Sequence, residues 1–251
     1  MWKAGTLLHG LLIVAWPLRS VAATPEVGSA PPARQEVLAG EPALLFYPAS
    51  PRPFDWRAGA GALVDILPTR IVESEQRQIP QLTGALRLGL PAHIAVDLRA
   101  RAILIQNQLE AGISWSFRLG PISFAVQNHL GPWFGFVDLD GFDATAWGLL
   151  ETPGVAVGVP WRDVRFALSS EAIVSFAQHT TLGDATKTSR QDVTFSGLVT
   201  TLVVETLLKS GGVPYFGVGL LWTQPDYQAW LAFSDERARI LYPRFMAGYG
   251  F

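Results

Sequence analysis

The feature that most constrains this chain is a two-residue alternation of apolar and polar side chains over several neighbouring segments. In residues 108–119, apolar side chains take every second position: Leu109, Ala111, Ile113, Trp115, Phe117 and Leu119. Successive side chains of a β-strand point to opposite faces of a sheet, so this segment has one apolar face and one polar face. The same pattern recurs in residues 82–90, 94–104 and 122–130.

Short turns separate these segments, so the pairing of neighbouring strands can be predicted. A hairpin centred on Ala92 places Leu86 opposite Leu98. A hairpin centred on Gln106-Asn107 places Leu98 opposite Trp115, and one centred on Gly120-Pro121 places Phe117 opposite Phe124. A slip by one residue would destroy each apolar match. We therefore predict a meander of four antiparallel strands with one continuous apolar face.

The first residues of the chain have the composition of an export signal. Residues 1–23 contain Lys3, then an apolar core, and end on Ala22-Ala23. This order is typical of a cleaved secretory signal peptide, and the core is shorter than the roughly 20 residues that a membrane-spanning helix needs. We expect export, followed by a periplasmic tail, rich in proline and alanine, at residues 24–53 that leads into the first strand.

The last segment, ILYPRFMAGYGF at residues 240–251, alternates up to its final residue. Phe245, Tyr249 and Phe251 share one face, and glycines lie on the other. A terminal Phe that closes an alternating aromatic strand resembles the C-terminal signature of Gram-negative outer-membrane β-barrel proteins. The resemblance implies a place in the bacterial outer membrane, contact with its lipid and lipopolysaccharide, and recognition of Phe251 by the barrel-assembly machinery.

Together these features predict an all-β fold, a transmembrane up-and-down antiparallel β-barrel formed by residues 54–251. The apolar faces of the strands would contact lipid, and the polar faces would line the lumen. An even number of strands returns the chain to the periplasm, and we expect about ten, with eight or twelve as alternatives. The strands are expected at residues 55–67, 79–90, 94–105, 108–119, 122–137, 145–158, 163–178, 192–209, 213–224 and 238–251.

Some stretches fit this scheme poorly or lie between strands. Pro153 has no N–H to donate to a strand ladder, so residues 151–154 are alternatively a loop that follows a short helix at 142–150. Residues 224–239 are ambiguous. Three longer polar stretches are expected to form outer loops: residues 69–78, 138–145 and 179–191.

Aromatic residues cluster near the ends of the predicted strands, where the girdles of outer-membrane barrels lie. Near the expected periplasmic turns are Phe117, Phe124, Trp161, Tyr215, Tyr249 and Phe251. Near the expected outer loops are Trp133, Phe134, Phe136, Trp147, Trp222 and Trp230. Aromatic residues of an ordinary core would explain this number but not this clustering.

The composition agrees with an outer surface that does not face water everywhere. Only 16% of the residues are charged, against about 25% in typical soluble proteins. The net charge of −2 argues against a nucleic-acid partner, and the absence of cysteine excludes disulfides and thiolate chemistry. The chain has no phosphate-binding glycine loop and no zinc motif, so we expect no cofactor.

Charged residues on the polar faces of the meander would meet inside the barrel. They are Arg87, Asp97, Arg99, Arg101, Glu110 and Arg118. In the predicted register Arg87 opposes Asp97, and Arg118 lies diagonal to Asp97. Glu110 lies diagonal to Arg101, and Arg99 has no obvious partner. Because unpaired charges in a low-dielectric lumen are costly, we favour a structural ion-pair network over a role in permeation.

A few polar residues near the predicted outer rim could carry chemistry. His179 is the candidate general base and Thr181 the candidate nucleophile, but the chain lacks the His-x-Ser pattern of lipid-cleaving barrels and the Asp-x-His pattern of omptin proteases. Asp138, Asp140 and Asp143 could offer oxygen ligands to Ca²⁺, but their spacing is not that of an EF-hand. We interpret both sets as polar loop residues.

The sequence thus favours a small non-catalytic outer-membrane barrel that is structural or forms a narrow pore for small solutes. About ten strands enclose far less space than the sixteen or more strands of wide porins. Two alternatives stay open. One is an outer-membrane surface enzyme that acts on lipid or peptide, with His179 at its centre, and the other is a secreted or periplasmic soluble β protein.

Overall fold

The computed structural model describes residues 44–49, 51–69, 78–103, 106–139, 142–182, 186–224 and 239–251, and every regular element in these ranges is a β-strand. The predicted signal peptide and most of the predicted tail lie outside the described residues. The strands are β1 (Trp56–Ile66), β2 (Gln78–Leu90), β3 (Ile94–Ile103), β4 (Gln106–Leu119), β5 (Ile122–Leu139), β6 (Phe142–Trp161), β7 (Val164–Leu182), β8 (Thr186–Arg190), β9 (Thr194–Thr206), β10 (Val213–Thr223) and β11 (Ile240–Gly250).

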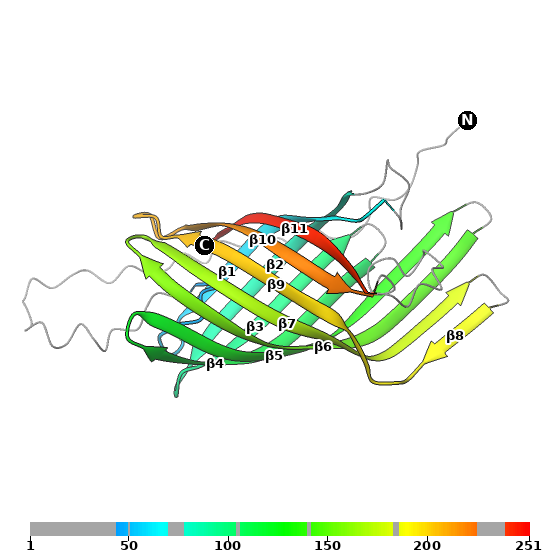
Figure 1. Cartoon of the computed structure of the whole chain (residues 1–251), viewed down its shortest axis with the longest axis horizontal. Helices are drawn as coiled ribbons and strands as arrows, with labels where there is room; N and C mark the ends of the chain where they lie inside the picture. The colour runs from blue at the N-terminus through cyan, green and yellow to red at the C-terminus, as the bar shows by residue number, and fades with distance from the viewer. Residues whose placement is uncertain are drawn as a thin grey trace, which may run out of the picture. The chain divides into compact units, whose positions relative to one another are not determined.

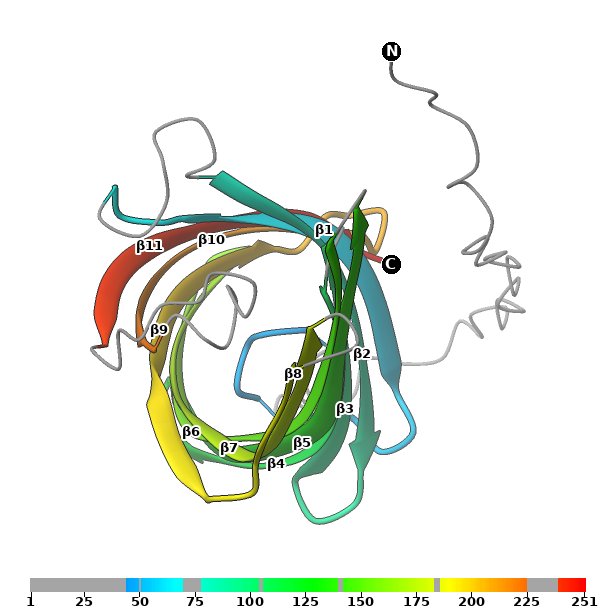
Figure 2. The same cartoon turned by 90° about the vertical axis from the view of Figure 1, so that its right-hand side faces the viewer.

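Among the described strands, all but β8 pair with a neighbour on each side and so close into a ring. The order is β6-β5-β4-β3-β2-β1-β11-β10-β9-β7, and β7 returns to β6. The last strand meets the first, with Ala60 opposite Tyr249 and Asp65 opposite Arg244. The fold is therefore a closed ten-stranded antiparallel up-and-down barrel, as the alternation predicts (Figures 1 and 2).

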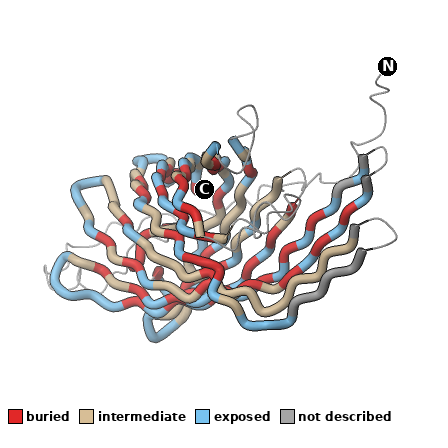
Figure 3. Tube along the Cα trace, turned by 45° about the vertical axis from the view of Figure 1, so that its right-hand side comes forward, coloured by how far each residue is buried: buried red, intermediate tan, exposed pale blue. Residues whose placement is uncertain are grey.

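Side chains alternate between the outside of the ring and its lumen, so buried and exposed residues alternate along the strands (Figure 3). On β4, Ile113 and Trp115 point outward and are more than half exposed, whereas Glu110 and Ser114 point inward and are buried. Exposed apolar side chains lie on strands all around the ring: Leu82, Ile113, Val126, Val155, Leu168, Leu202, Phe216 and Leu241. The outer surface of the barrel is therefore predominantly apolar.

No connection at one end of the barrel is longer than residues 207–212, and we call this the short-turn end; the opposite end, where β1–β2 and β10–β11 have the longest connections, is the loop end. Turns at residues 91–93 and 120–121 join consecutive strands as predicted, and the third turn, expected at 159–163, is confined to 162–163 because β6 continues to Trp161. Ala92 and Gly120 adopt positive φ angles of 62° and 61° to reverse the chain. The final residue lies at the same end, where the Phe251 N–H donates to the Ala58 carbonyl at 2.9 Å.

The predicted register is correct for two of the three hairpins. Leu86 lies opposite Leu98, and Phe117 lies opposite Phe124. The β3–β4 prediction is wrong, because Leu98 lies opposite Ala111 and not Trp115. The two strands pair up to Ile103 and Gln106, so the turn lies two residues earlier in the chain than predicted. The error is four residues, an even number, so every side chain keeps its predicted face.

Strands β5, β6 and β7 are 18, 20 and 19 residues long and extend past the loop end of the ring, together with β8 (Figure 1). The predicted outer loops at 138–145 and 179–191 are therefore largely wrong, because most of these residues lie in strands. Polarity suggested loops, but strand pairing continues through Asp138 and Asp143 and through Thr180 and Thr181, and threonine is frequent in strands.

The alternative of a short helix at 142–150 is also wrong, since β6 runs through it and through Pro153. The pairing of β6 with β7 skips Thr152 and Pro153, which removes the demand for an N–H donor from the proline. Two predicted girdle residues, Tyr215 and Trp133, face the lumen and are buried. Trp230 lies outside the described residues.

One glycine tests how tightly β4 and β5 approach. The pairing of these strands is interrupted beside Gly131, where a Cβ atom would overlap the Leu109 carbonyl. We predict that Gly131→Ala lowers the free energy of unfolding by about 1–3 kcal/mol, measured by urea titration in detergent micelles. The control is Gly84→Ala on β2, whose Cβ would meet only the Ala100 Cβ at 3.9 Å. Equal stability of the two variants would contradict this close approach.

Candidate functional site

The lumen holds a chain of ion pairs. Arg87 lies directly opposite Asp97, as predicted, with its Nε 3.5 Å from Asp97 Oδ1. His129 from β5 places its Nε2 3.9 Å from the other Asp97 oxygen. Arg101 lies 3.6 Å from Glu110, its predicted diagonal neighbour. All of these side chains are buried or nearly so, which fits charges that are held in pairs.

Arg99 has a partner, contrary to the prediction. Its Nη1 donates to Glu171 Oε1 at 2.7 Å across the lumen, from β3 to β7. The corrected register also places Glu110 directly opposite Arg99. Arg118 is not next to Asp97, because Asp97 lies opposite Gly112, six residues away along β4. Arg118 is instead an exposed residue of the short-turn end.

A second tight pair joins the first and last strands. Arg244 donates from Nε to Asp65 Oδ1 at 2.6 Å and from Nη2 to Oδ2 at 2.8 Å, a bidentate geometry. Gln81 donates to the same carboxylate at 2.8 Å. Asp65 is completely buried, so this pair fixes the closure of the ring on its lumen side.

The most informative element inside the barrel is not a strand. Residues 44–49 lie within the ring of strands at its short-turn end (Figure 2). We call this segment the plug. Leu44, Leu45, Tyr47 and Ala49 are all at most 9% exposed. The ring centroids of Phe46 and Tyr215 lie 4.9 Å apart. The plug takes no part in strand pairing.

One carboxylate holds the plug. Glu205 on β9 is fully buried and accepts hydrogen bonds from three successive backbone N–H groups: Leu45 at 2.9 Å, Phe46 at 3.2 Å and Tyr47 at 2.7 Å. From the opposite wall, Arg87 Nη1 donates to the Tyr47 carbonyl at 3.2 Å. A carboxyl group on one wall and a guanidinium group on the other thus satisfy the plug backbone, and hydrogen bonds to an ionised partner such as Arg87 are the stronger kind.

The lumen toward the loop end contains an apolar cluster. Inward-facing residues of several strands form it: Leu67, Trp133, Ala144, Ala146, Leu150, Ile173, Val199, Leu221, Ile240 and Tyr242. Trp133 and Tyr242 are at most 2% exposed. This cluster is held by packing and not by ion pairs.

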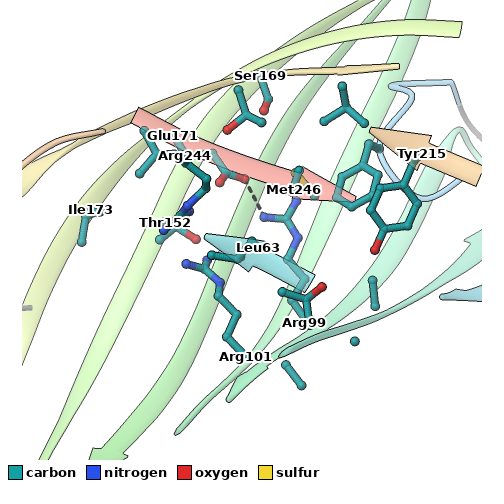
Figure 4. A pocket seen from close by; sticks show the side chains of 18 residues that line it. Leu63, Arg99, Arg101, Thr152, Ser169, Glu171, Ile173, Tyr215, Arg244 and Met246 are labelled. Carbon is teal, nitrogen blue, oxygen red and sulfur yellow. Dashed lines mark hydrogen bonds and ion pairs between the residues drawn. The ribbon is translucent and has the colours of Figure 1, made fainter. Parts of the chain in front are cut away.

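A cavity of about 100 Å³ lies between the plug and the apolar cluster. Phe46 of the plug lines one side, and Ile173 and Val199 of the cluster line the other. Arg99 and Glu171 face it with their ion pair, as Figure 4 shows. This volume has room for several water molecules or one small solute.

The residues considered for catalysis lie elsewhere. His179 lies opposite Trp147 on the outward face of the β6–β7 extension, and its ring stacks on the Trp147 indole at 4.2 Å. Thr181 lies two residues further, opposite Thr145, on the same outward face. Neither residue therefore faces the lumen.

The residues considered for metal binding lie at the tip of the β5–β6 extension. Asp138 and Asp143 lie opposite one another, and Asp140 is outside the described residues. Within the described ranges, no group of three or more potential metal ligands comes together. The same ranges contain no helix that is long and apolar enough to cross a membrane.

Sequence reasoning missed Asp65, Glu171, Glu205 and the plug. For Glu205 a signal was present, since it interrupts the apolar run of residues 198–208 at an inward-facing position. Nothing in the sequence of residues 44–49 distinguishes a plug from an extended tail. Glu171 and Arg99 lie on strands that are not neighbours, so no hairpin register could pair them.

We predict that Glu205→Gln loosens the plug, because an amide side chain offers one acceptor oxygen and no charge to three N–H donors. The chain has no cysteine, so Ala49→Cys introduces a unique thiol in the plug. Reaction of this thiol with a water-soluble maleimide should accelerate about tenfold or more in the Glu205→Gln background. The control is Glu151→Gln, which removes a carboxylate bonded to Asn128 outside the lumen. Equal rates in both backgrounds would contradict the assigned role of Glu205.

No protein-family model matches the chain, and no curated protein matches it in sequence. Several solved structures do match. Neisserial surface protein A (NspA) is 8% identical with a TM-score of 0.36, over 78% of this chain and 94% of that one. The translocator domain of the autotransporter NalP from Neisseria meningitidis is 10% identical with a TM-score of 0.34, over 78% and 88%. CarO2 of Acinetobacter baumannii is 10% identical with a TM-score of 0.23, over 78% and 98%.

Proposed function

We propose that this chain is a small non-catalytic outer-membrane β-barrel whose lumen is a narrow pathway for small solutes. The observation that carries the proposal is the central cavity, which lies between two closures of different kinds. The plug closes the short-turn end, and the apolar cluster closes the loop end. The barrel is thus closed at rest, unlike a wide diffusion pore.

The outer surface supports the membrane part of the proposal. Soluble monomers rarely expose apolar patches larger than a few hundred Å². Here apolar side chains such as Leu82, Ile113 and Phe216 are each more than half exposed around the whole ring. A closed barrel satisfies its backbone hydrogen bonds internally, as a structure in lipid must. The longest connections, β1–β2 and β10–β11, both join strands at the loop end, and outer-membrane barrels have short periplasmic turns and longer extracellular loops, so the short-turn end is assigned to the periplasm.

The plug supports a pathway in preference to a permanently filled lumen. Its attachment consists of hydrogen bonds and packing, and it contributes no strand to the sheet. It can leave the lumen without unpairing any strand of the ring. The outward stacking of His179 on Trp147 supports a non-catalytic role, because that residue has no access to the cavity.

If the outward face contacts lipid, the cost of placing a charge on it should depend strongly on depth in the bilayer. Ile113→Arg puts a charge on the outward face at the middle of β4 and should lower the free energy of unfolding in lipid vesicles by about 2–4 kcal/mol. Leu119→Arg, on the same face at the end of β4, should cost only about 0–1 kcal/mol. Urea titration of both variants checks this. Equally small effects would indicate that the apolar face does not meet lipid.

The closed pathway predicts a conductance phenotype. In planar bilayers the wild-type barrel should be nearly silent, whereas Glu205→Gln should show frequent openings of small conductance, because the plug is released more often. The migration of unheated and boiled samples on a detergent gel verifies that the variant is folded. A folded variant as silent as the wild type would leave the barrel with a structural role only.

A further inference from the structure

The central cavity has two chemically different walls. Guanidinium groups reach it from β3 and β11, contributed by Arg99, Arg101 and Arg244, with Glu171 as the one carboxylate among the lining residues (Figure 4). Apolar side chains form the other wall: Phe46, Leu63, Val203 and Met246. Each of these guanidinium groups has a carboxylate partner (Glu171, Glu110 and Asp65), so the lining combines paired charges with an apolar surface.

The charged wall has donors to offer. Arg99 is the clearest case, because its side chain is 23% exposed and its described hydrogen bond uses Nη1 alone. A guanidinium carries five N–H donors, so Nη2 and Nε can bind a further acceptor. A carboxylate accepts such donors in a bidentate geometry, and these charge-assisted bonds are strong.

A buried hydroxyl points to the same place. Thr152 on β6 is 5% exposed and lines the cavity, and its Oγ1 has no hydrogen-bond partner within the described ranges. Buried polar groups are nearly always paired with protein or with a bound molecule. An unpartnered buried hydroxyl that lines a cavity beside Arg99 and Arg101 therefore indicates a polar occupant.

We propose that the cavity binds a small organic anion with an apolar body, such as an aromatic carboxylate. The carboxylate lies on the guanidinium wall near Arg99, with Thr152 as a further donor, and the apolar body lies against Leu63, Val203 and Met246. Ligand sites of this kind combine an apolar lining with a few convergent polar groups. The inference that this ligand is the transported solute rests on the proposed function. Binding of the ligand in the cavity does not require transport.

Equilibrium dialysis of the full chain in detergent micelles tests the proposal with benzoate as the probe. Inorganic phosphate carries the charge without the apolar body, and benzyl alcohol carries the body without the charge. We expect saturable benzoate binding with a Kd of about 1 mM or tighter, and at least tenfold weaker binding of the other two probes. Protein-free micelles provide the blank. No saturable benzoate binding, or equal binding of all three probes, would overturn the proposal.

Two variants locate the site. Ala85→Leu fills the cavity and keeps every charge, and it should weaken benzoate binding at least tenfold. Ala62→Leu makes the same change on the exposed outward face of β1 and should leave binding unchanged. The double variant Arg101→Gln/Glu110→Gln removes this ion pair and keeps the net charge of the lumen, and it should weaken benzoate more than benzyl alcohol. Equal benzoate affinity in the two leucine variants, each folded by gel migration, would place the probe elsewhere and overturn the proposal.

The outcome is separable from the proposed function. Benzoate binding in a barrel that stays silent after Glu205→Gln would retain the site and remove the pathway. Conductance in Glu205→Gln without saturable benzoate binding in the wild type would retain the pathway and overturn the site.

Discussion

The structure depends on the pairing of β1 with β11, which turns an alternating sheet into a closed barrel. An open sheet of this length would leave two edges with unpaired N–H and C=O groups, and closure pairs them. Closure also separates the two sets of alternating side chains, because one face of every strand then surrounds a lumen and the other forms the outer surface. The buried Asp65–Arg244 pair joins the same two strands from within, so backbone and side chains close the ring together.

This dependence explains which parts of the fold the sequence could predict. Strand positions and faces follow from a period of two, which is local, and Leu86, Phe117 and Phe251 all point as predicted. The β3–β4 register was predicted wrongly because a shift of four residues leaves every side chain on the same face of the sheet. The apolar pattern therefore cannot distinguish Ala111 from Trp115 as the partner of Leu98. The full length of the projecting hairpins was not predicted, because polar residues such as Asp138, Asp143 and Thr180 were assigned to loops although they lie in paired strands.

The candidate site was predictable only in part, because a lumen brings together residues that no hairpin relates. Arg87 and Asp97 are cross-strand neighbours and could be paired from the sequence, whereas Arg99 meets Glu171 from a strand on the far side of the ring. The plug is a longer-range case, since Glu205 binds backbone N–H groups about 160 residues away, which carry no side-chain signal. A single inward Glu in an apolar run indicated a buried partner but not its identity.

The plug and the apolar cluster border the central cavity on opposite sides, and they are held by interactions of different kinds. The plug is held by directional hydrogen bonds to Glu205 and Arg87 and by the packing of Leu45 and Tyr47. The apolar cluster around Trp133 and Leu150 is held by many weak contacts, which give way gradually and favour no single geometry. Phe46 belongs to the plug and lines the cavity, whereas Ile173 and Val199 line it from the apolar cluster, so the cavity lies where these two kinds of packing meet.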